Sequence, residues 1–104
     1  MALDIVLCSA LGNAASVGIP IRGPVCLHVT GTTPTTATLQ TSNDTTDGSN
    51  GTWVNWPGGT FTANQSGFRV DAPRASWPNS GLWFRVQNTA GWATISVSAG
   101  LVDT

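Results

Sequence analysis

Short runs in which apolar and polar residues alternate recur along the chain. They predict β-strands, because successive side chains of a strand point to opposite faces of its sheet. In residues 25–30 the apolar side chains of Val25, Leu27 and Val29 share one face. A short apolar run at residues 4–8 predicts a further strand, buried in the core or between subunits. The residues that the alternation places inward elsewhere are Ala37, Leu39, Phe68, Val70, Leu82, Phe84, Val86, Ile95, Val97 and Ala99.

Clusters of Gly, Pro, Thr, Ser and Asn separate these runs and predict turns. They lie at residues 31–36, 57–59, 73–81 and 89–92. The turn at 57–59 is expected to end one strand and to start another short one. Helix formers are scarce, whereas Gly, Thr, Ser, Val and Trp are plentiful, and this composition favours an all-β fold. About eight short strands with frequent turns predict an antiparallel two-sheet β-sandwich or jelly roll.

The N-terminal part of the chain is expected to differ from the rest. Residues 9–24 are rich in small residues, Gly and Pro, which is typical of an extended arm that contacts a neighbouring subunit or of a surface loop. We expect one domain of 104 residues, in which residues 1–24 form a strand and an arm and residues 25–104 form the sandwich. The start resembles a secretion signal, but it lacks a basic region and carries Asp4, so no signal peptide is predicted.

Charged residues are few, and this limits the partners that the chain is expected to bind. It has 4 Arg and 5 Asp but no Lys and no Glu, and its formal net charge is −1. Phosphate binding needs clustered cations, so nucleic acid is not an expected partner. A net charge near zero does little to keep copies of the protein apart, which a protein of an assembly tolerates. No run of 18 apolar residues is present, so no transmembrane helix is predicted.

The chain offers few groups for catalysis or metal binding. Its single histidine, His28, lies on the polar face of a predicted strand. No nucleophile-elbow or cysteine-protease motif surrounds its serines or its two cysteines, Cys8 and Cys26, and the spacing of Cys26 and His28 matches no familiar zinc pattern. We predict no enzyme activity, no catalytic residue, no metal and no cofactor. The two cysteines are predicted to be free, although the sequence leaves a disulfide open.

The stretch TLQTSNDTTDGSNGTWVNW predicts a hairpin with a long loop. Asn43 and Asp44 can cap the turn with their own side chains. Gly48 or Gly51 can supply the positive φ that such a turn needs, and Trp53 can pack over it. The stretch therefore specifies a local structure rather than a chemistry.

The same loop offers oxygen atoms that calcium could use. They belong to Asn43, Asp44, Asp47 and Asn50. Their spacing does not match an EF-hand loop. Asx turns that close the hairpin are the favoured interpretation of these residues.

The loop also carries a motif that two known families share. The motif is LQ-x-SND followed by G-x-W-V, and three short segments follow it in order: FTA at 61–63, WFRV at 83–86 and TISV at 94–97. In this order the segments resemble a group of small β-sandwich virion proteins of tailed bacteriophages, over residues 36–99. The motif also resembles, more weakly, the discoidin-like galactose-binding modules, which are usually longer and have a terminal cysteine pair. The residues that carry the motif are Leu39, Gln40, Ser42, Asn43, Asp44, Gly51, Trp53 and Val54, and the chain departs from both families by widening the loop with Thr45, Thr46, Ser49 and Asn50.

Tryptophan is frequent, with 5 residues in the chain. Trp53 or Trp56 is expected to lie in the core. Strand parity exposes Trp83 beside Arg85 unless a partner or the second sheet covers it. Exposed Trp and Arg are typical anchors of protein interfaces, and Trp is also a typical platform for sugars. Two further tryptophans, Trp77 and Trp92, lie in predicted turns and are expected to be exposed.

The virion-protein resemblance implies a structural role. The chain would be a capsid decoration, or cement, protein that binds the major capsid protein on the outer surface of a phage head. It would be made in the cytoplasm of the bacterial host and would form a homo-oligomer, with a trimer favoured. Residues 2–21 are the expected contact segment. The residues predicted for the interface are Leu3, Ile5, Leu7, Ile19, Ile21, Trp77, Trp83, Arg85 and Trp92.

Two other functions fit the same sequence. One is a carbohydrate-binding module that stacks a glycan on Trp83 or Trp92 and binds its hydroxyls through Asn43, Asp44 and Asp47. The other is a neck or tail-fibre component of the same virion. An apolar contact segment favours the assembly protein, whereas a functional monomer would favour the glycan-binding module.

Overall fold

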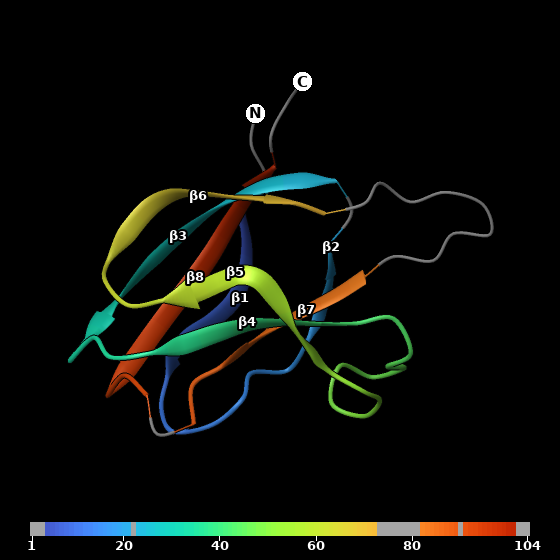
Figure 1. Cartoon of the computed structure of the whole chain (residues 1–104), viewed down its shortest axis with the longest axis horizontal. Coiled ribbons are helices and arrows are strands. Elements are labelled where there is room, and N and C mark those ends of the chain that lie inside the picture. The colour runs from blue at the N-terminus through green and yellow to red at the C-terminus, as the bar shows by residue number, and fades with distance from the viewer. Residues whose placement is uncertain (1–3, 22, 73–81, 90, 102–104) are drawn as a thin grey trace.

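The computed structural model describes residues 4–21, 23–72, 82–89 and 91–101, and these residues form an all-β fold (Figure 1). Two antiparallel sheets of four strands each face one another as a β-sandwich, as predicted. Sheet A has the strand order β1-β8-β3-β6, and sheet B has the order β2-β7-β4-β5. The strands are β1 (Asp4–Leu11), β2 (Ile19–Ile21), β3 (Pro24–Thr32), β4 (Ala37–Ser42), β5 (Val54–Phe61), β6 (Gln65–Asp71), β7 (Leu82–Gln87) and β8 (Thr94–Leu101).

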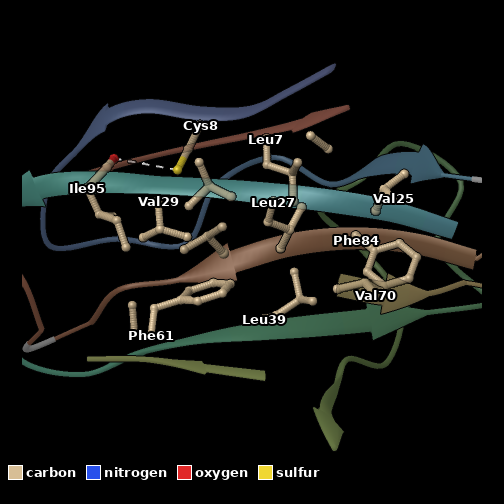
Figure 2. Packing of buried hydrophobic residues seen from close by; sticks show 14 of the residues in the cluster. Leu7, Cys8, Val25, Leu27, Val29, Leu39, Phe61, Val70, Phe84 and Ile95 are labelled. Atoms are coloured by element: carbon tan, nitrogen blue, oxygen red, sulfur yellow. Dashed lines mark hydrogen bonds between the residues drawn. The ribbon is translucent and has the colours of Figure 1, made fainter. Parts of the chain in front are cut away.

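The core lies between the two sheets, where the alternating apolar residues meet (Figure 2). In β3, Val25, Leu27 and Val29 are fully buried, and the partner strand β8 buries Ile95 and Val97 beside them. Burial of each such side chain stabilises the fold by roughly 1.5–3 kcal/mol. The predicted inward faces of the other strands are confirmed: Ala37, Leu39, Val70, Phe84, Val86 and Ala99 are buried, and Phe68 and Leu82 pack against the core while partly exposed.

Strand β5 differs from the sequence prediction. We expected residues 57–59 to form a turn between two strands, but β5 runs through them with a register shift in its pairing with β4. Gly59 is buried there, and an added Cβ would lie only 3.0 Å from Leu39 Cβ and 3.1 Å from Trp56 Cβ. The glycine therefore lets the strand bulge past the core instead of ending.

The strand predicted at residues 4–8 is present within β1, but the segment after it differs from the expected arm. Residues 4–11 form an edge strand of sheet A, and Ile19–Ile21 form an edge strand of sheet B. Between them the chain is bonded to β7, because Ser16 N donates to Val86 O at 2.9 Å and Val86 N donates to Ser16 Oγ at 2.8 Å. Residues 4–21 are thus part of the sandwich rather than an extension from it. The hydrogen bonds between this segment and β7 could not be predicted from the spacing of residues in the sequence.

Candidate functional site

The loop between β4 and β5 is held by its own side chains. Asp44 Oδ1 accepts hydrogen bonds from Ser42 Oγ at 2.7 Å and from Thr52 N at 2.8 Å. Asp47 Oδ1 accepts from Ser49 N at 2.8 Å and from Asn50 N at 2.9 Å. The predicted Asx turn is therefore present at Asp47, whereas Asp44 joins the two ends of the loop, and one oxygen of each carboxylate is bonded within the loop.

Asn50 is the centre of this loop. Its Oδ1 accepts from Thr45 Oγ1 and Thr46 N, each at 2.8 Å, and its backbone carbonyl accepts from Trp53 Nε1 at 3.0 Å. Trp53 thus packs over the turn, as predicted. The sequence predicted a positive φ at Gly48 or Gly51. Both glycines have it, with φ values of 88° and 87°.

These hydrogen bonds also lower the pKa values of the two carboxyl groups in the loop. Bonds from Thr52 N and then from Ser42 Oγ hold the pKa of Asp44 below its ordinary value. Bonds from Asn50 N and then from Ser49 N do the same for the pKa of Asp47. Both groups are exposed, so the effect is a local preference for the ionised form.

The loop docks on the chain that leads into β2 (Figure 1). Gly18 N donates to Gly48 O at 2.8 Å. A Cβ on Gly18 would meet the Trp53 ring at 2.3 Å, and a Cβ on Gly48 would meet Gly18 O at 2.4 Å. The loop and Trp53 lie against this segment because both positions lack side chains.

Trp53 is stacked on Arg85. The guanidinium carbon of Arg85 lies 4.4 Å from the centroid of the Trp53 ring, which is a cation–π contact. Arg85 projects from the outer face of sheet B, since its neighbours Phe84 and Val86 are buried on the inner face. The loop therefore places an aromatic ring on the outside of the sandwich.

Two amide side chains extend this contact across the sheet. Arg85 Nε donates to Gln40 Oε1 at 2.8 Å, and Gln40 Nε2 donates to Asn55 Oδ1 at 3.0 Å. Arg85, Gln40 and Asn55 are cross-strand neighbours on β7, β4 and β5. We call Trp53, Arg85, Gln40 and Asn55 the Trp53–Arg85 face. It is a connected set of polar and aromatic side chains, and its Trp and Arg are residue types enriched in protein interfaces.

Trp83 lies on the same side of sheet B as Arg85. It is partly buried, and its register partners are Pro20 on β2 and Ser42 on β4. The alternation of side chains along β7 correctly placed Trp83 and Arg85 on the same face. Sequence reasoning missed Trp53, Gln40 and Asn55 as members of this face. Gln40 could have been found from its alternation with Leu39, but only the loop's path brings Trp53 over Arg85.

Three residues predicted for an interface lie in the core instead. Leu7 is 4% exposed, Ile21 is 2% exposed and Trp92 is 1% exposed. Ile5 and Ile19 are partly buried and pack against the same core. The four residues of β1 and β2 are inward because these segments are strands of the two sheets. Leu3 and Trp77 lie outside the described residues.

Trp92 is buried because other parts of the chain receive it. Its Nε1 donates to Phe61 O at 3.1 Å, and its backbone N donates to Asn88 Oδ1 at 2.8 Å. A Cβ on Gly31 would lie 2.7 Å from the Trp92 ring, so the missing side chain of Gly31 makes room for the indole. The turn predicted to expose this tryptophan folds it inward.

The other residues that could bind a metal are not grouped in the part of the chain that the structure describes. Among the described residues no group of three His, Cys, Asp or Glu is close enough to hold a metal, and no helix is long and apolar enough to cross a membrane.

Cys8 and Cys26 are free thiols. Burial raises the pKa of the Cys8 thiol to about 11, so this sulfur is a core group rather than a nucleophile. A hollow of about 220 Å³ beside Thr41 and Val54 is smaller than typical small-molecule sites.

Comparison with known proteins adds no relative. No family model matches the chain, and neither a curated protein nor a solved structure resembles it at a significant level.

Proposed function

We propose that this chain is a structural virion protein of a tailed bacteriophage and that it decorates the outer surface of the phage head. The observation that carries the proposal is the Trp53–Arg85 face, a partly exposed, hydrogen-bonded surface that contains Trp and Arg, residue types that anchor protein interfaces. The resemblance of residues 36–99 to small β-sandwich virion proteins supports the virion as the place of action.

The mechanism would be clamping of neighbouring capsid subunits. Each copy would bury its Trp53–Arg85 face on the major capsid protein, and repeated lattice sites would supply multivalency. A homo-oligomer, with a trimer favoured, would bind several subunits at once. Because Leu7 and Ile21 lie in the core, we move the proposed capsid contact from the N-terminal segment to this face. Attachment at the neck or the tail fibres is the variant of this proposal that the same surface allows.

A carbohydrate-binding module is the second candidate. The observation that favours it is that Arg85 connects the Trp53 ring to the amides of Gln40 and Asn55, since sugars stack on rings and hydrogen-bond to polar side chains. Two of the expected hydroxyl ligands, Asp44 and Asp47, accept bonds within the loop, and Trp92 is buried. The glycan-binding residues named from the sequence are therefore reduced to Asn43 and Trp83.

The test uses particles made from the genome that carries this gene, with the gene intact or deleted. We expect the protein on purified heads and not on isolated tails. Deletion particles should release DNA at a lower temperature, and added purified protein should restore them. Particles of equal composition and heat stability would contradict a decoration role, and protein found on tails alone would assign it to the neck or fibre. Saturable binding to a glycan array without binding to heads would favour the second candidate.

A further inference from the structure

The edges of sheet A are unsuited to pairing with another strand. Edge strands present unpaired backbone groups, and proteins block them with bulges, prolines or short length. Strand β1 has two register shifts in its pairing with β8. Strand β6 contains Gly67 at a φ of 76°, and its pairing with β3 is also shifted. Neither edge offers a long, regular ladder.

The edges of sheet B are blocked in the same way. Strand β2 has three residues, and its central residue is Pro20, which has no N–H to donate. Strand β5 contains Pro57 and a register shift. A partner protein is therefore expected to contact a face of the sandwich rather than to add a strand to it.

Of the two outer faces, that of sheet B carries a charge with no described counterion. Arg85 is partly buried, and its described contacts are neutral: the Trp53 ring and the Gln40 amide. Among the described residues the one ion pair is Arg69–Asp71, in sheet A, with Nε and Oδ1 2.8 Å apart. Because Arg85 is only partly buried and bonds to Gln40 through Nε, a carboxylate of a ligand would be the first charged partner among its described contacts.

Three of the chain's five carboxylates accept bonds from groups other than Arg85. One oxygen each of Asp44 and Asp47 is bonded within the loop, and Asp71 is paired with Arg69. The guanidinium is also oriented in advance, because the ring and the amide oxygen hold two of its sides. An arginine fixed in this way loses little freedom when it binds a carboxylate with both of its terminal nitrogens.

We propose that the Trp53–Arg85 face binds a carboxylate side chain, Asp or Glu, on the surface of a partner protein. The carboxylate would accept hydrogen bonds from the Arg85 guanidinium, while an apolar part of the partner covers the Trp53 ring and the Gln40 and Asn55 amides bond at the rim. This inference rests on the proposed function, because it names the chemistry that the capsid surface would have to present.

The first test needs no virion. The full-length ¹⁵N-labelled protein is titrated with sodium N-acetylglutamate at constant ionic strength, and the Nε–H of Arg85 and the indole N–H of Trp53 are followed by NMR. The comparison ligands are N-acetylglutaminamide, which is neutral because both of its carboxyl groups are amides, and the acidic sugar glucuronate. Arg69 is the internal control, because its own carboxylate is already beside it. We expect saturable shifts at Arg85 and Trp53 with N-acetylglutamate, small shifts at Arg69, and none with N-acetylglutaminamide.

The matched variants are Arg85→Lys and Arg69→Lys. Lysine keeps the charge but loses the two-pronged geometry, so Arg85→Lys should weaken N-acetylglutamate and head binding roughly tenfold, while Arg69→Lys should leave both unchanged. The indole N–H of Trp53 reports whether each variant retains the loop. Equal responses at Arg69 and Arg85, or no response, would overturn the inference, and tighter binding of glucuronate would overturn the protein partner. Normal binding of the Arg85→Lys protein to heads would contradict the carboxylate site but would remain consistent with the decoration role. Carboxylate binding without binding to heads would support the carboxylate site but contradict the decoration role.

Discussion

At the scale of single residues, the side chains that matter most to the fold are those that satisfy buried backbone groups. Asn88 is fully buried, and its side chain joins parts of the chain that are far apart in sequence. Its Nδ2 donates to Gly12 O at 2.9 Å and to Trp92 O at 3.0 Å, and its Oδ1 accepts from Trp92 N at 2.8 Å. One amide therefore ties the connection after β1 to the turn before β8.

Replacement of Asn88 by alanine should destabilise the protein by about 1–3 kcal/mol. The variant leaves the Trp92 carbonyl and the Trp92 N–H without their Asn88 partners, while the Gly12 carbonyl keeps its bond from Ala14 N. An unmade buried hydrogen bond costs its desolvation energy. Chemical denaturation monitored by tryptophan fluorescence would measure the change. Asn43→Ala is the control, since Asn43 is exposed and such substitutions usually change stability by less than about 0.5 kcal/mol. Equal stability of the two variants would show that the Asn88 bonds contribute nothing net.

At the scale of elements, the loop between β4 and β5 shows how far local sequence reasoning reaches. The Asx turn at Asp47, the glycines with positive φ and the position of Trp53 over the turn all follow from contacts between near neighbours in the chain. The contact of Gly48 with Gly18 and the stacking of Trp53 on Arg85 join residues that are distant in sequence. No spacing rule within the loop could have predicted them.

The loop should loosen in acid. Asp44 and Asp47 each have a folded-state pKa below the ordinary value of 3.8. Their ionised forms are favoured in the folded loop, so their contribution to stability is complete above pH 3.8 and is lost as the pH falls through the lower folded values. The indole N–H of Trp53, followed by NMR between pH 6 and pH 2, should report the change. In Asp47→Asn the amide oxygen can still accept both bonds, so this variant should keep the loop at neutral pH and show a weaker acid transition. A Trp53 signal that does not change over this range would contradict the prediction.

At the scale of the whole molecule, the N-terminal strands hold the two sheets together. Leu7 and Ile21 are almost fully buried, and they come from β1 in one sheet and β2 in the other. Burial of these two side chains alone stabilises the fold by roughly 3–6 kcal/mol. That is a large part of the roughly 5–15 kcal/mol that stabilises a typical domain.

Deletion of residues 1–21 should therefore unfold the protein or bring it close to unfolding. The deletion removes β1 and β2 and exposes the edges of β8 and β7. Circular dichroism and thermal unfolding of the truncated chain would show the loss, and light scattering would show aggregation of the exposed strands. A truncated chain that melts like the intact protein, as a smaller oligomer, would restore the alternative in which this segment is an arm between subunits. The Arg85→Lys protein is the control for loss of binding without loss of fold.

The sequence by itself determined the all-β class, the inward face of most strands and the local structure of the β4–β5 loop. These features depend on the two-residue period of a strand and on hydrogen bonds between near neighbours. Only the tertiary structure decided that Trp92 is buried, that β5 bulges through residues 57–59, that residues 4–21 complete both sheets, and that Trp53 lies on Arg85. The reason is that each of these depends on which distant backbone makes room, such as Gly31 for Trp92 and Gly18 for Trp53. Such contacts are set when the sheets pack and leave no periodic signal in the chain.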